Sequence, residues 1–485
     1  MQLSELARIV PNATVRGDTG VEVSGATADS RAAGRGLLFF CIPGAHKDGH
    51  DYAADAVARG AAAIVVERPL DLPVPQLVVP SVRGAIGSLS SAVFGHPSRS
   101  MDVVGVTGTN GKTTTAFMLE RAFRALGRTT GLIGTVEVHV DRDVLPVVHT
   151  TPEAPELQRL LARMRDRGAD AVAMEVSSHG LAFGRVAGTR FRCGIFTNLT
   201  RDHLDFHGTM EEYEAAKREL FTEAFAERGA VNADDPAGAR ILAAPAIPLT
   251  SFGFGREVDV RAVEVALGSA GSNFTCEAGA ERVSVEVRIA GHFNVTNALG
   301  VLAAFRAMGL PLGAAAEGIA GLDNVPGRME RVDAGQRFTV LVDYAHTPDS
   351  LENVLRAARQ LTDRSLIVVF GCGGDRDRGK RPLMGRVATE LADLAVITSD
   401  NPRSEDPLAI IREITPGAEA TERPFEIEAD RRAAIRLAFE RAKPGDVVVI
   451  AGKGHETGQK FADRVLDFDD RVVARDELAE LGAGR

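Results

Sequence analysis

A short run of glycine, threonine and lysine, Thr107–Thr114, has the residue types and spacing of a loop that binds phosphate. Glycines allow backbone N–H groups to close around phosphate oxygens, and the helix expected next points the positive end of its dipole at them. Lys112 adds a mobile cation, and the Thr113 hydroxyl is a suitable ligand for magnesium. The run therefore predicts a bound nucleoside triphosphate, ATP or GTP, with Mg²⁺.

The run departs from the general phosphate-loop pattern at one position. The pattern G-x-x-x-x-G-K-[ST] requires glycine at position 106, where this chain has Val106. What remains is the narrower form Thr-Gly-Thr-Asn-Gly-Lys-Thr-Thr. An ordinary glycine-rich turn between a strand and a helix stays the alternative.

Two acidic segments follow later apolar runs and are candidates for metal binding. Glu175 ends the run Ala171–Glu175, which puts its carboxylate at the carboxyl edge of the expected sheet, beside the phosphate loop. Magnesium prefers such hard oxygen ligands, shared with nucleotide phosphates. Asp202, His203 and Asp205 follow the next apolar run. An acid that merely ends a strand and a structural histidine are the alternatives.

Three motifs suggest other chemistry but fail on their spacing. Ser177–Gly180 places serine beside histidine, yet no G-x-S-x-G elbow accompanies it, so we interpret the serines as groups that hydrogen-bond a substrate. Gly452–Gln459 contains His455-Glu456 but has glutamine where H-E-x-x-H requires histidine. Gly371–Arg376 lacks the last glycine of the dinucleotide fingerprint. The last two are expected to be loops that bind anions or other ligands.

The elements around these residues alternate between strands and helices. Residues 1–100 are expected to form a small α/β domain, and Gly95–Ser100 is a candidate linker. In 101–326, strands at 101–106, 169–176 and 191–197 alternate with amphipathic helices, which predicts a parallel sheet, interrupted by a β-rich portion at about 252–290. In 327–485 the alternation of strands and helices continues, with strands expected at 338–343, 366–370, 394–398 and 447–450. The fold class predicted is α/β, in three domains: a small N-terminal α/β domain, a central P-loop parallel-sheet ATPase domain and a C-terminal Rossmann-like α/β domain.

Composition narrows the class of protein. With 485 residues, the chain is too long to fold around a single hydrophobic core. Its net charge of −10 argues against nucleic acid as a partner. Cys41, Cys193, Cys276 and Cys372 show no paired spacing, which indicates neither disulfides nor a structural zinc site and fits the cytoplasm. No run is apolar and long enough for insertion into a membrane. We expect small-molecule substrates and a monomer.

The narrow loop form resembles that of the Mur ligase family, ATP-dependent amide-forming enzymes that build the peptide of bacterial cell-wall precursors, and the resemblance covers essentially the whole chain. It implies a UDP-substrate domain (1–100), an ATP-binding domain (101–326) and an amino-acid-binding domain (327–485). It implies Lys112, Glu175, His203 and Lys217 as catalytic residues. Metal ligands would be Thr113, Glu175, His203 and Lys217, with Lys217 carbamylated; a lysine on a helix surface is the alternative.

The resemblance also implies residues for two of the substrates. Those matching ATP-binding positions are Gly108, Thr109, Asn110, Gly111, Lys112, Thr113, Thr114, Asn294, Asn297, Arg328 and Asp343. Those matching positions for the UDP-linked substrate are Ser30, Thr150, Thr151, Ser177 and Arg185.

One motif discriminates among members of the family. Asp400-Asn401-Pro402-Arg403 resembles the signature of members that add meso-diaminopimelate rather than L-lysine. Diaminopimelate carries a second carboxylate, and the planar fork of Arg403 suits bidentate carboxylate binding. By resemblance, Arg376, Gly452 and Glu456 complete the pocket, Arg376 toward a carboxylate and Glu456 toward an ammonium.

The expected reaction is ATP-dependent addition of meso-diaminopimelate to UDP-N-acetylmuramoyl-L-alanyl-D-glutamate through an acyl phosphate. The rivals are a ligase of the same fold that adds L-lysine, a folylpolyglutamate synthase, and a non-catalytic nucleotide-binding switch. Glu175, His203 and the Asp400 loop disfavour the switch.

Overall fold

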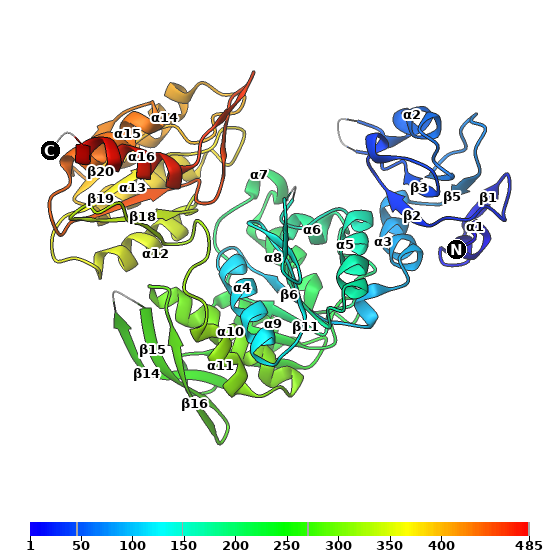
Figure 1. The fold of residues 1–485 in the computed structure, drawn as a ribbon, viewed down its shortest axis with the longest axis horizontal. Coiled ribbons are helices and arrows are strands. Elements are labelled where there is room, and N and C mark those ends of the chain that lie inside the picture. The colour runs from blue at the N-terminus through cyan, green and yellow to red at the C-terminus, as the bar shows by residue number, and fades with distance from the viewer. Residues whose placement is uncertain (45–46, 148, 269–270, 484–485) are drawn as a thin grey trace.

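Three separate β-sheets follow one another along the chain, each covered by its own helices. The computed structural model describes residues 1–485 except 45–46, 148, 269–270 and 484–485. The N-terminal and C-terminal parts lie on either side of the central part (Figure 1). The predicted α/β class is confirmed.

The N-terminal sheet has five strands in the order β1-β5-β4-β3-β2, of which β1 alone is antiparallel. Its strands are β1 (Thr14–Arg16), β2 (Gly25–Thr27), β3 (Leu37–Phe40), β4 (Ala63–Val66) and β5 (Gln76–Val78). The helices beside it are α1 (Leu3–Ala7), α2 (Ala53–Ala58) and α3 (Val82–Val93). The segment 95–100, expected to be a linker, is packed against the rest of the protein, because it contains a 3₁₀ turn at Pro97–Arg99 in which Pro97 and Ser98 are buried.

The central sheet has eleven strands in the order β16-β15-β14-β13-β12-β11-β6-β10-β7-β8-β9. The strands from β14 to β7 in this order are parallel, and both edges are antiparallel extensions. Their bounds are β6 (Asp102–Thr107), β7 (Thr130–Ile133), β8 (Val138–Val140), β9 (Asp143–Leu145), β10 (Ala171–Glu175), β11 (Cys193–Phe196), β12 (Gly229–Asn232), β13 (Leu249–Gly253), β14 (Val260–Gly268), β15 (Gly271–Ala278) and β16 (Glu281–Val287). The β-rich portion at 252–290 thus extends the parallel sheet rather than interrupting it.

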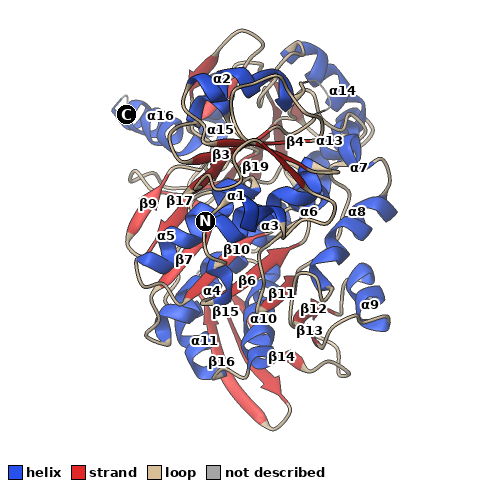
Figure 2. Ribbon diagram, turned by 90° about the vertical axis from the view of Figure 1, so that its right-hand side faces the viewer, coloured by secondary structure: helices blue, strands red, loops and turns tan. Residues whose placement is uncertain are grey.

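Helices cover both faces of this central sheet (Figure 2). On one face the core includes α4 (Lys112–Ala125), α10 (His292–Met308) and α11 (Leu312–Ala320). On the other it includes α5 (Ala154–Asp166), α6 (Ser178–Ala182) and α9 (Pro236–Ala243), beyond which lie α7 (Leu204–His207) and α8 (Met210–Arg218).

The C-terminal sheet has six strands in the order β17-β18-β22-β19-β20-β21, with β17 antiparallel. Its strands are β17 (Glu330–Val332), β18 (Thr339–Asp343), β19 (Leu366–Phe370), β20 (Leu394–Ile397), β21 (Phe425–Ile427) and β22 (Val447–Ala451). Its helices are α12 (Pro348–Arg359), α13 (Lys380–Leu391), α14 (Pro407–Glu419), α15 (Arg431–Arg441) and α16 (Asp470–Ala483). A hairpin of β23 (Gly458–Lys460) and β24 (Val465–Asp467) follows β22.

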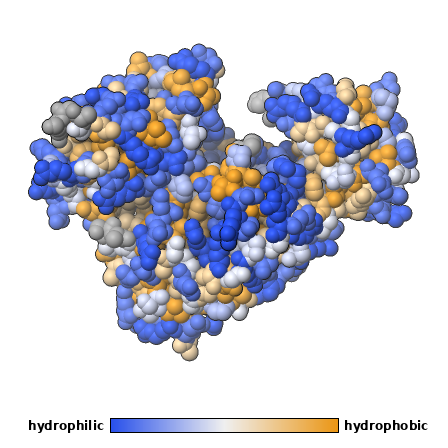
Figure 3. All heavy atoms as spheres, in the orientation of Figure 1, coloured by the Kyte–Doolittle hydropathy of each residue, from blue (hydrophilic) through white to orange (hydrophobic). Residues whose placement is uncertain are grey.

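The surface of the molecule carries a wide gap between the N-terminal and C-terminal parts (Figure 3). Among the described residues, none of the helices combines the length and the apolar character that crossing a membrane requires.

Candidate functional site

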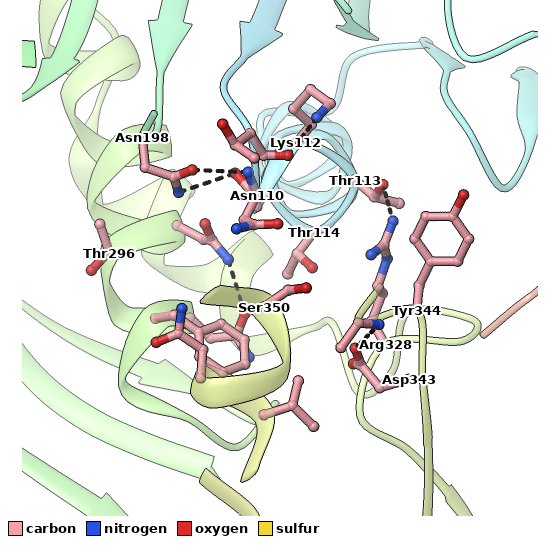
Figure 4. Close-up of a pocket in the computed structure, with 18 of the residues that line it drawn as sticks. Asn110, Lys112, Thr113, Thr114, Asn198, Thr296, Arg328, Asp343, Tyr344 and Ser350 are labelled. Atoms are coloured by element: carbon pink, nitrogen blue, oxygen red, sulfur yellow. Dashed lines mark hydrogen bonds between the residues drawn. The ribbon is translucent and has the colours of Figure 1, made fainter. Parts of the chain in front are cut away.

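A cavity of about 620 Å³ lies where the central sheet meets the start of the C-terminal part. It is lined by the loop between β6 and α4, by residues after β10 and β11, and by parts of α8, α10 and α12. The predicted site residues that line it are Thr109, Asn110, Gly111, Lys112, Thr113, Thr114, Thr150, Glu175, Ser177, His203, Lys217, Asn294, Asn297, Arg328 and Asp343. Residues from both sides of the cavity meet across it in Figure 4.

The loop before α4 requires glycine at two positions. Gly108 has φ +153, and a Cβ there would lie 1.9 Å from Thr197 Oγ1. Gly111 caps α4 with φ +85, and a Cβ there would lie 2.3 Å from Asn297 Oδ1. Val106, the departure from the general pattern, is a buried residue of β6, so that position belongs to the strand. The loop is therefore tight, held by side chains of two neighbouring elements, and opens directly into a helix N-terminus.

Two amines, of the half-buried Lys112 and the buried Lys217, share one carbonyl oxygen of this loop. Lys112 Nζ donates to Gly108 O at 2.9 Å and to Thr109 O at 2.8 Å, and Lys217 Nζ donates to Gly108 O at 2.7 Å. Lys217 is 1% exposed, so the alternative of a lysine on a helix surface is wrong. Burial, together with the charge of Lys112, lowers the pKa of Lys217 well below its usual range. Both amines thus lie at the floor of the cavity, beside the backbone of the loop.

Glu175 lies at the carboxyl edge of the sheet, as predicted. It pairs with Val106 in the register of β10 and β6 and is 1% exposed. The backbone N–H of Thr135 donates to Glu175 Oε1 at 2.7 Å, and the Thr135 hydroxyl donates to Oε2 at 3.0 Å. These bonds fix the orientation of the carboxylate toward the cavity.

Asp202 and His203 lie together on the opposite wall, but Asp205 is exposed and does not join them. Asp202 Oδ2 lies 3.4 Å from His203 Nε2 and 3.7 Å from His346 Nε2, which comes from the C-terminal part. Burial lowers the pKa of His203 to about 3, so its ring is neutral. A neutral imidazole retains a lone pair for a metal ion.

Residues after β18 and before β17 form the far wall of the cavity (Figure 4). Arg328 Nη2 donates to Thr113 Oγ1 at 2.9 Å, and its guanidinium lies 4.7 Å from the centre of the Tyr344 ring. Its Nε is buried, and no hydrogen-bond partner for it is found within the described part of the chain. Asp343 accepts bonds from the backbone N–H groups of Met329 and Ala345, and burial raises its pKa. A cation with an unused donor thus faces the phosphate loop.

Asn294 and Asn297 stand on the first turns of α10, behind the loop. Asn297 Nδ2 donates to Asn294 Oδ1 at 3.0 Å, and Asn294 Nδ2 donates to Ala290 O at 2.8 Å. Asn110 Nδ2 donates to Asp349 Oδ2 at 2.6 Å, which joins the phosphate loop to the first turn of α12. The two parts of the molecule therefore close on the cavity together.

The oxygen donors around the loop fit magnesium. Among the described residues, no three His, Cys, Asp or Glu side chains form a metal-binding group. Thr113 and Glu175 offer hard oxygens next to the phosphate loop, and magnesium is usually held by one or two carboxylates with substrate phosphates rather than by a complete protein cage.

The predicted amino-acid residues form a second cluster, outside the cavity, at the carboxyl ends of β19, β20 and β22. Asn401 Nδ2 donates to Glu456 Oε2 at 2.7 Å. Gly452 has φ +120, and a Cβ there would lie 2.4 Å from Asp400 Oδ2. Arg403 Nη1 donates to Gly374 O at 2.7 Å.

The side chains of Arg376 and Arg403 both lie close to Gly373. A Cβ at Gly373 would lie 2.8 Å from Arg403 Nη1 and 3.9 Å from Arg376 Cγ. The structure therefore brings together the residues predicted for the amino acid, which are Arg376, Asp400, Asn401, Pro402, Arg403, Gly452 and Glu456.

The residues predicted for the UDP-linked substrate do not all lie together. Thr150 and Ser177 line the cavity, while Ser30 lies in a 3₁₀ turn beside the N-terminal sheet. Thr151 is 1% exposed; its hydroxyl donates to Glu175 O and accepts from Ser177 N, so it braces the strand end. Arg185 pairs with Glu153 at 2.9 Å and lies outside the cavity lining.

Several cavity residues escaped prediction from sequence. Thr135, Tyr213, Tyr344 and His346 line the cavity, and Lys453 lies inside the amino-acid cluster. Tyr344 and His346 directly follow the predicted strand that ends at Asp343, so their position after a strand was a usable signal. Thr135 and Tyr213 carry no such signal, because only the folded sheet brings them to the loop.

Comparison with known proteins gives matches along the whole chain. Residues 22–93 match the model "Mur ligase family, catalytic domain", 106–305 "Mur ligase middle domain" and 327–454 "Mur ligase, glutamate ligase domain". A protein of Geobacillus thermodenitrificans called UDP-N-acetylmuramoyl-L-alanyl-D-glutamate--2,6-diaminopimelate ligase is 47% identical over 99% of this chain and 100% of its own length. A protein of the same name from Streptomyces avermitilis is 46% identical, covering 99% and 96%.

A solved structure of a ligase with that name is 32% identical and covers 99% of both chains, with a TM-score of 0.69.

Proposed function

The chain belongs to the Mur ligase family, and on that premise we propose that it joins meso-2,6-diaminopimelate to UDP-N-acetylmuramoyl-L-alanyl-D-glutamate at the expense of ATP. It is an ATP-dependent ligase that forms a peptide bond and acts in peptidoglycan synthesis. The observation that carries the choice of amino acid is the cluster around Arg403. The Arg403 guanidinium and the Glu456 carboxylate in one cluster suit an amino acid with a second carboxylate beside its ammonium group.

The phosphate side of the reaction falls to the loop before α4. Backbone amides at the start of α4 and the Lys112 amine bind the triphosphate, and Arg328 approaches it from the C-terminal part. Asn294, Asn297 and Asp343 bind the nucleotide farther from the reacting phosphate. When Lys112 Nζ binds phosphate, its hydrogen bonds to Gly108 O and Thr109 O are broken.

Chemistry then proceeds in two displacements. An oxygen of the D-glutamate γ-carboxylate attacks the γ-phosphorus of ATP, the bond to the β–γ bridging oxygen breaks, and ADP leaves. The diaminopimelate amine next attacks the acyl carbon, phosphate leaves, and the amine loses a proton to give the amide. Lys112 and the loop amides hold the two anionic reactants together, which otherwise repel each other.

Magnesium, when bound, would offset the negative charge that gathers between carboxylate and triphosphate. Thr113 and Glu175 would hold one ion, and His203 with Lys217 would help to hold a second. Lys217 would serve as its carbamate, an anion formed from the amine and CO₂ with release of a proton. Its full burial beside the loop supports this role.

The UDP-linked substrate is proposed to extend from the cavity to the N-terminal part. Thr150 and Ser177 would contact it near the reacting carboxylate, and Ser30 would bind near the uridine end. Thr151 and Arg185 would support this wall. The gap between the outer parts of the molecule leaves room for an extended substrate (Figure 3).

A panel of amines tests the proposal directly. ADP release from ATP is measured with the UDP-linked dipeptide and meso-diaminopimelate, L-lysine or no amine. We expect fast release with diaminopimelate, little with L-lysine and a background rate without amine. Lysine outperforming diaminopimelate would point to the lysine-adding rival, and release with a folate acceptor to a folylpolyglutamate synthase. ATP binding with no phosphate released under any condition would favour a nucleotide switch.

A further inference from the structure

Lys453 is buried at the centre of the amino-acid cluster, where three segments of the C-terminal part meet. It lies two residues after the end of β22, and its side chain is 0% exposed. Its ammonium donates to Gly458 O at 2.7 Å, to Asn401 Oδ1 at 3.2 Å and to Glu456 Oε2 at 3.3 Å. One cation therefore ties the Asp400 loop, the Gly452 loop and strand β23 together.

The partners of Lys453 are the residues that the proposed function assigns to the incoming amino acid. Asn401 and Glu456 are also bonded to each other, at 2.7 Å. The backbone N–H of Lys460 donates to Asn401 Oδ1, and that of Arg403 donates to Lys460 O. The orientation of Glu456 thus depends on two contacts, Asn401 and Lys453, and that of Asn401 on three.

Charges of both signs surround the cluster. Arg376, Arg403 and Lys453 bring three positive charges, against the three carboxylates of Asp375, Asp400 and Glu456. The nearby Arg431 is fully buried but is paired with Asp470, so this pair adds no net charge. Of the three cations, Lys453 is the most deeply buried, because Arg376 is exposed and Arg403 is half-buried.

We propose that Lys453 is a positioning residue that orients Asn401 and Glu456 and that, through its charge, selects against an amino acid with an unaccompanied ammonium group. This rests on the proposed function. The far end of L-lysine adds one positive charge to the cluster, whereas the far end of diaminopimelate, with both ammonium and carboxylate, adds none. A buried cation therefore penalises lysine more than diaminopimelate.

The substitution Lys453→Met tests this, because methionine is apolar and unbranched and removes the charge and the hydrogen bonds. Lys443→Met is the matched control, since Lys443 is exposed at the opposite end of β22. Steady-state kinetics with diaminopimelate and with L-lysine are compared for wild type and both variants. We expect kcat/KM for diaminopimelate to fall about tenfold in Lys453→Met, mainly through KM. The KM values for ATP and the UDP-linked substrate should change less than about twofold.

The decisive quantity is the ratio of kcat/KM for diaminopimelate to that for lysine. The proposal predicts that Lys453→Met lowers this ratio at least about threefold, while Lys443→Met leaves it unchanged. A residue that only stabilises the fold would reduce both amino acids alike, and an unchanged ratio would overturn the proposal.

Lys453→Gln provides the second variant, because its amide can still donate to Gly458 O while the charge is lost. It should show the same fall in the ratio. Thermal unfolding of each variant accompanies the kinetics; if both variants fail to fold, the lysine serves stability and the proposal is wrong. Wild-type turnover with diaminopimelate tests the proposed function separately, since it involves no change at Lys453.

Discussion

At the scale of single residues, the floor of the cavity combines groups that repel one another. Lys112 and Lys217 donate to the same carbonyl oxygen, and Arg328 faces them from across the cavity. Burial lowers the pKa of Lys217 well below its usual range, so Lys112 and Arg328 supply the positive charge at the loop. In the proposed function the triphosphate lies between these two groups, so the arrangement is organised for the bound state rather than for the empty one.

Arg328 provides the clearest prediction at this scale. Its replacement in Arg328→Ala removes a charged donor that faces the phosphate loop and stacks on Tyr344. We expect kcat/KM for ATP to fall about 10- to 100-fold, or roughly 1.5–3 kcal/mol, because hydrogen bonds to charged groups contribute on that order. The measurement is the dependence of the initial rate on ATP with the other substrates saturating.

Arg331→Ala is the control for this substitution, since Arg331 is exposed on β17 only three residues away. It should leave the ATP dependence unchanged. An Arg328→Ala enzyme with the ATP dependence of wild type would show that this guanidinium does not contact the nucleotide.

The position of a site residue could be predicted from sequence when the residue lies at the end of a buried strand or in the phosphate loop itself. Glu175 ends a buried strand, and the period of the sheet carries it to the edge beside the loop. Lys112 follows from the loop sequence itself. The burial of Lys217 could not be read from α8, because it results from packing of that short helix against a distant loop. Thr151 matches a substrate-binding position in type, yet its hydroxyl is used inside the protein.

At the scale of elements, an ion-paired histidine links β8 to helix α4, which carries Lys112 at its first turn. His139 Nδ1 lies 2.9 Å from Glu120 Oε1, and its Nε2 lies 2.8 Å from Glu137 Oε2. Burial alone would lower the pKa of His139, but the hydrogen bonds and charges of the two glutamates outweigh it and raise the pKa to about 9. The folded protein therefore binds this proton more tightly than the unfolded chain does.

The resulting pH dependence has a definite sign. The contribution of protonated His139 to stability is fully present below its ordinary pKa of 6.5 and is lost as pH rises through about 9. We expect His139→Gln to reduce the free energy of unfolding more at about pH 6 than at about pH 10, relative to wild type. Urea unfolding of both proteins at the two pH values measures this.

Subtracting variant from wild type at each pH removes the effect of the other titrating groups, which the two proteins share. A loss of stability of equal size at both pH values would contradict a raised pKa for His139. A larger loss at the higher pH would reverse the assigned direction.

In the central and C-terminal sheets, the parallel strands that followed from sequence are β6, β10, β11, β18, β19, β20 and β22. The strands β7, β12 and β13, which also lie inside the central sheet, and the edge strands did not follow from it. The run 366–370 corresponds to β19 residue for residue, because fully buried parallel strands are uninterrupted apolar runs. The segment that forms β14–β16 was recognisable as β-rich, but its local sequence does not determine which edge of which sheet these strands extend. The hairpin β23–β24 was missed because its strands are three residues long and largely exposed.

At the scale of the whole molecule, the proposed function divides the reactants among the three large sheets. The central sheet presents the phosphate loop, the C-terminal sheet presents the Asp400 cluster, and the N-terminal part carries Ser30. Contacts such as Asn110 with Asp349 and Arg201 with Asp377 at 3.0 Å already join the central and C-terminal parts. The division at residues 100 and 326, the monomeric state and the cytoplasmic location stay predictions.

This arrangement has one chemical consequence that distinguishes it from other ways of activating an acid. If the carboxylate attacks the γ-phosphorus, one of its own oxygens must leave with the released phosphate. Attack at the α-phosphorus would instead carry that oxygen into AMP. The fate of the oxygen therefore reports which phosphorus the loop and Lys112 present to the acid.

The most direct test uses the UDP-linked dipeptide labelled with heavy oxygen in its D-glutamate γ-carboxylate, together with ATP and meso-diaminopimelate. Mass spectrometry of the products should find one labelled oxygen in each phosphate released, with ADP and the amide formed in equal amounts. Phosphate without label, or label in AMP, would contradict transfer of the γ-phosphoryl group to the acid and with it the proposed role of the phosphate loop.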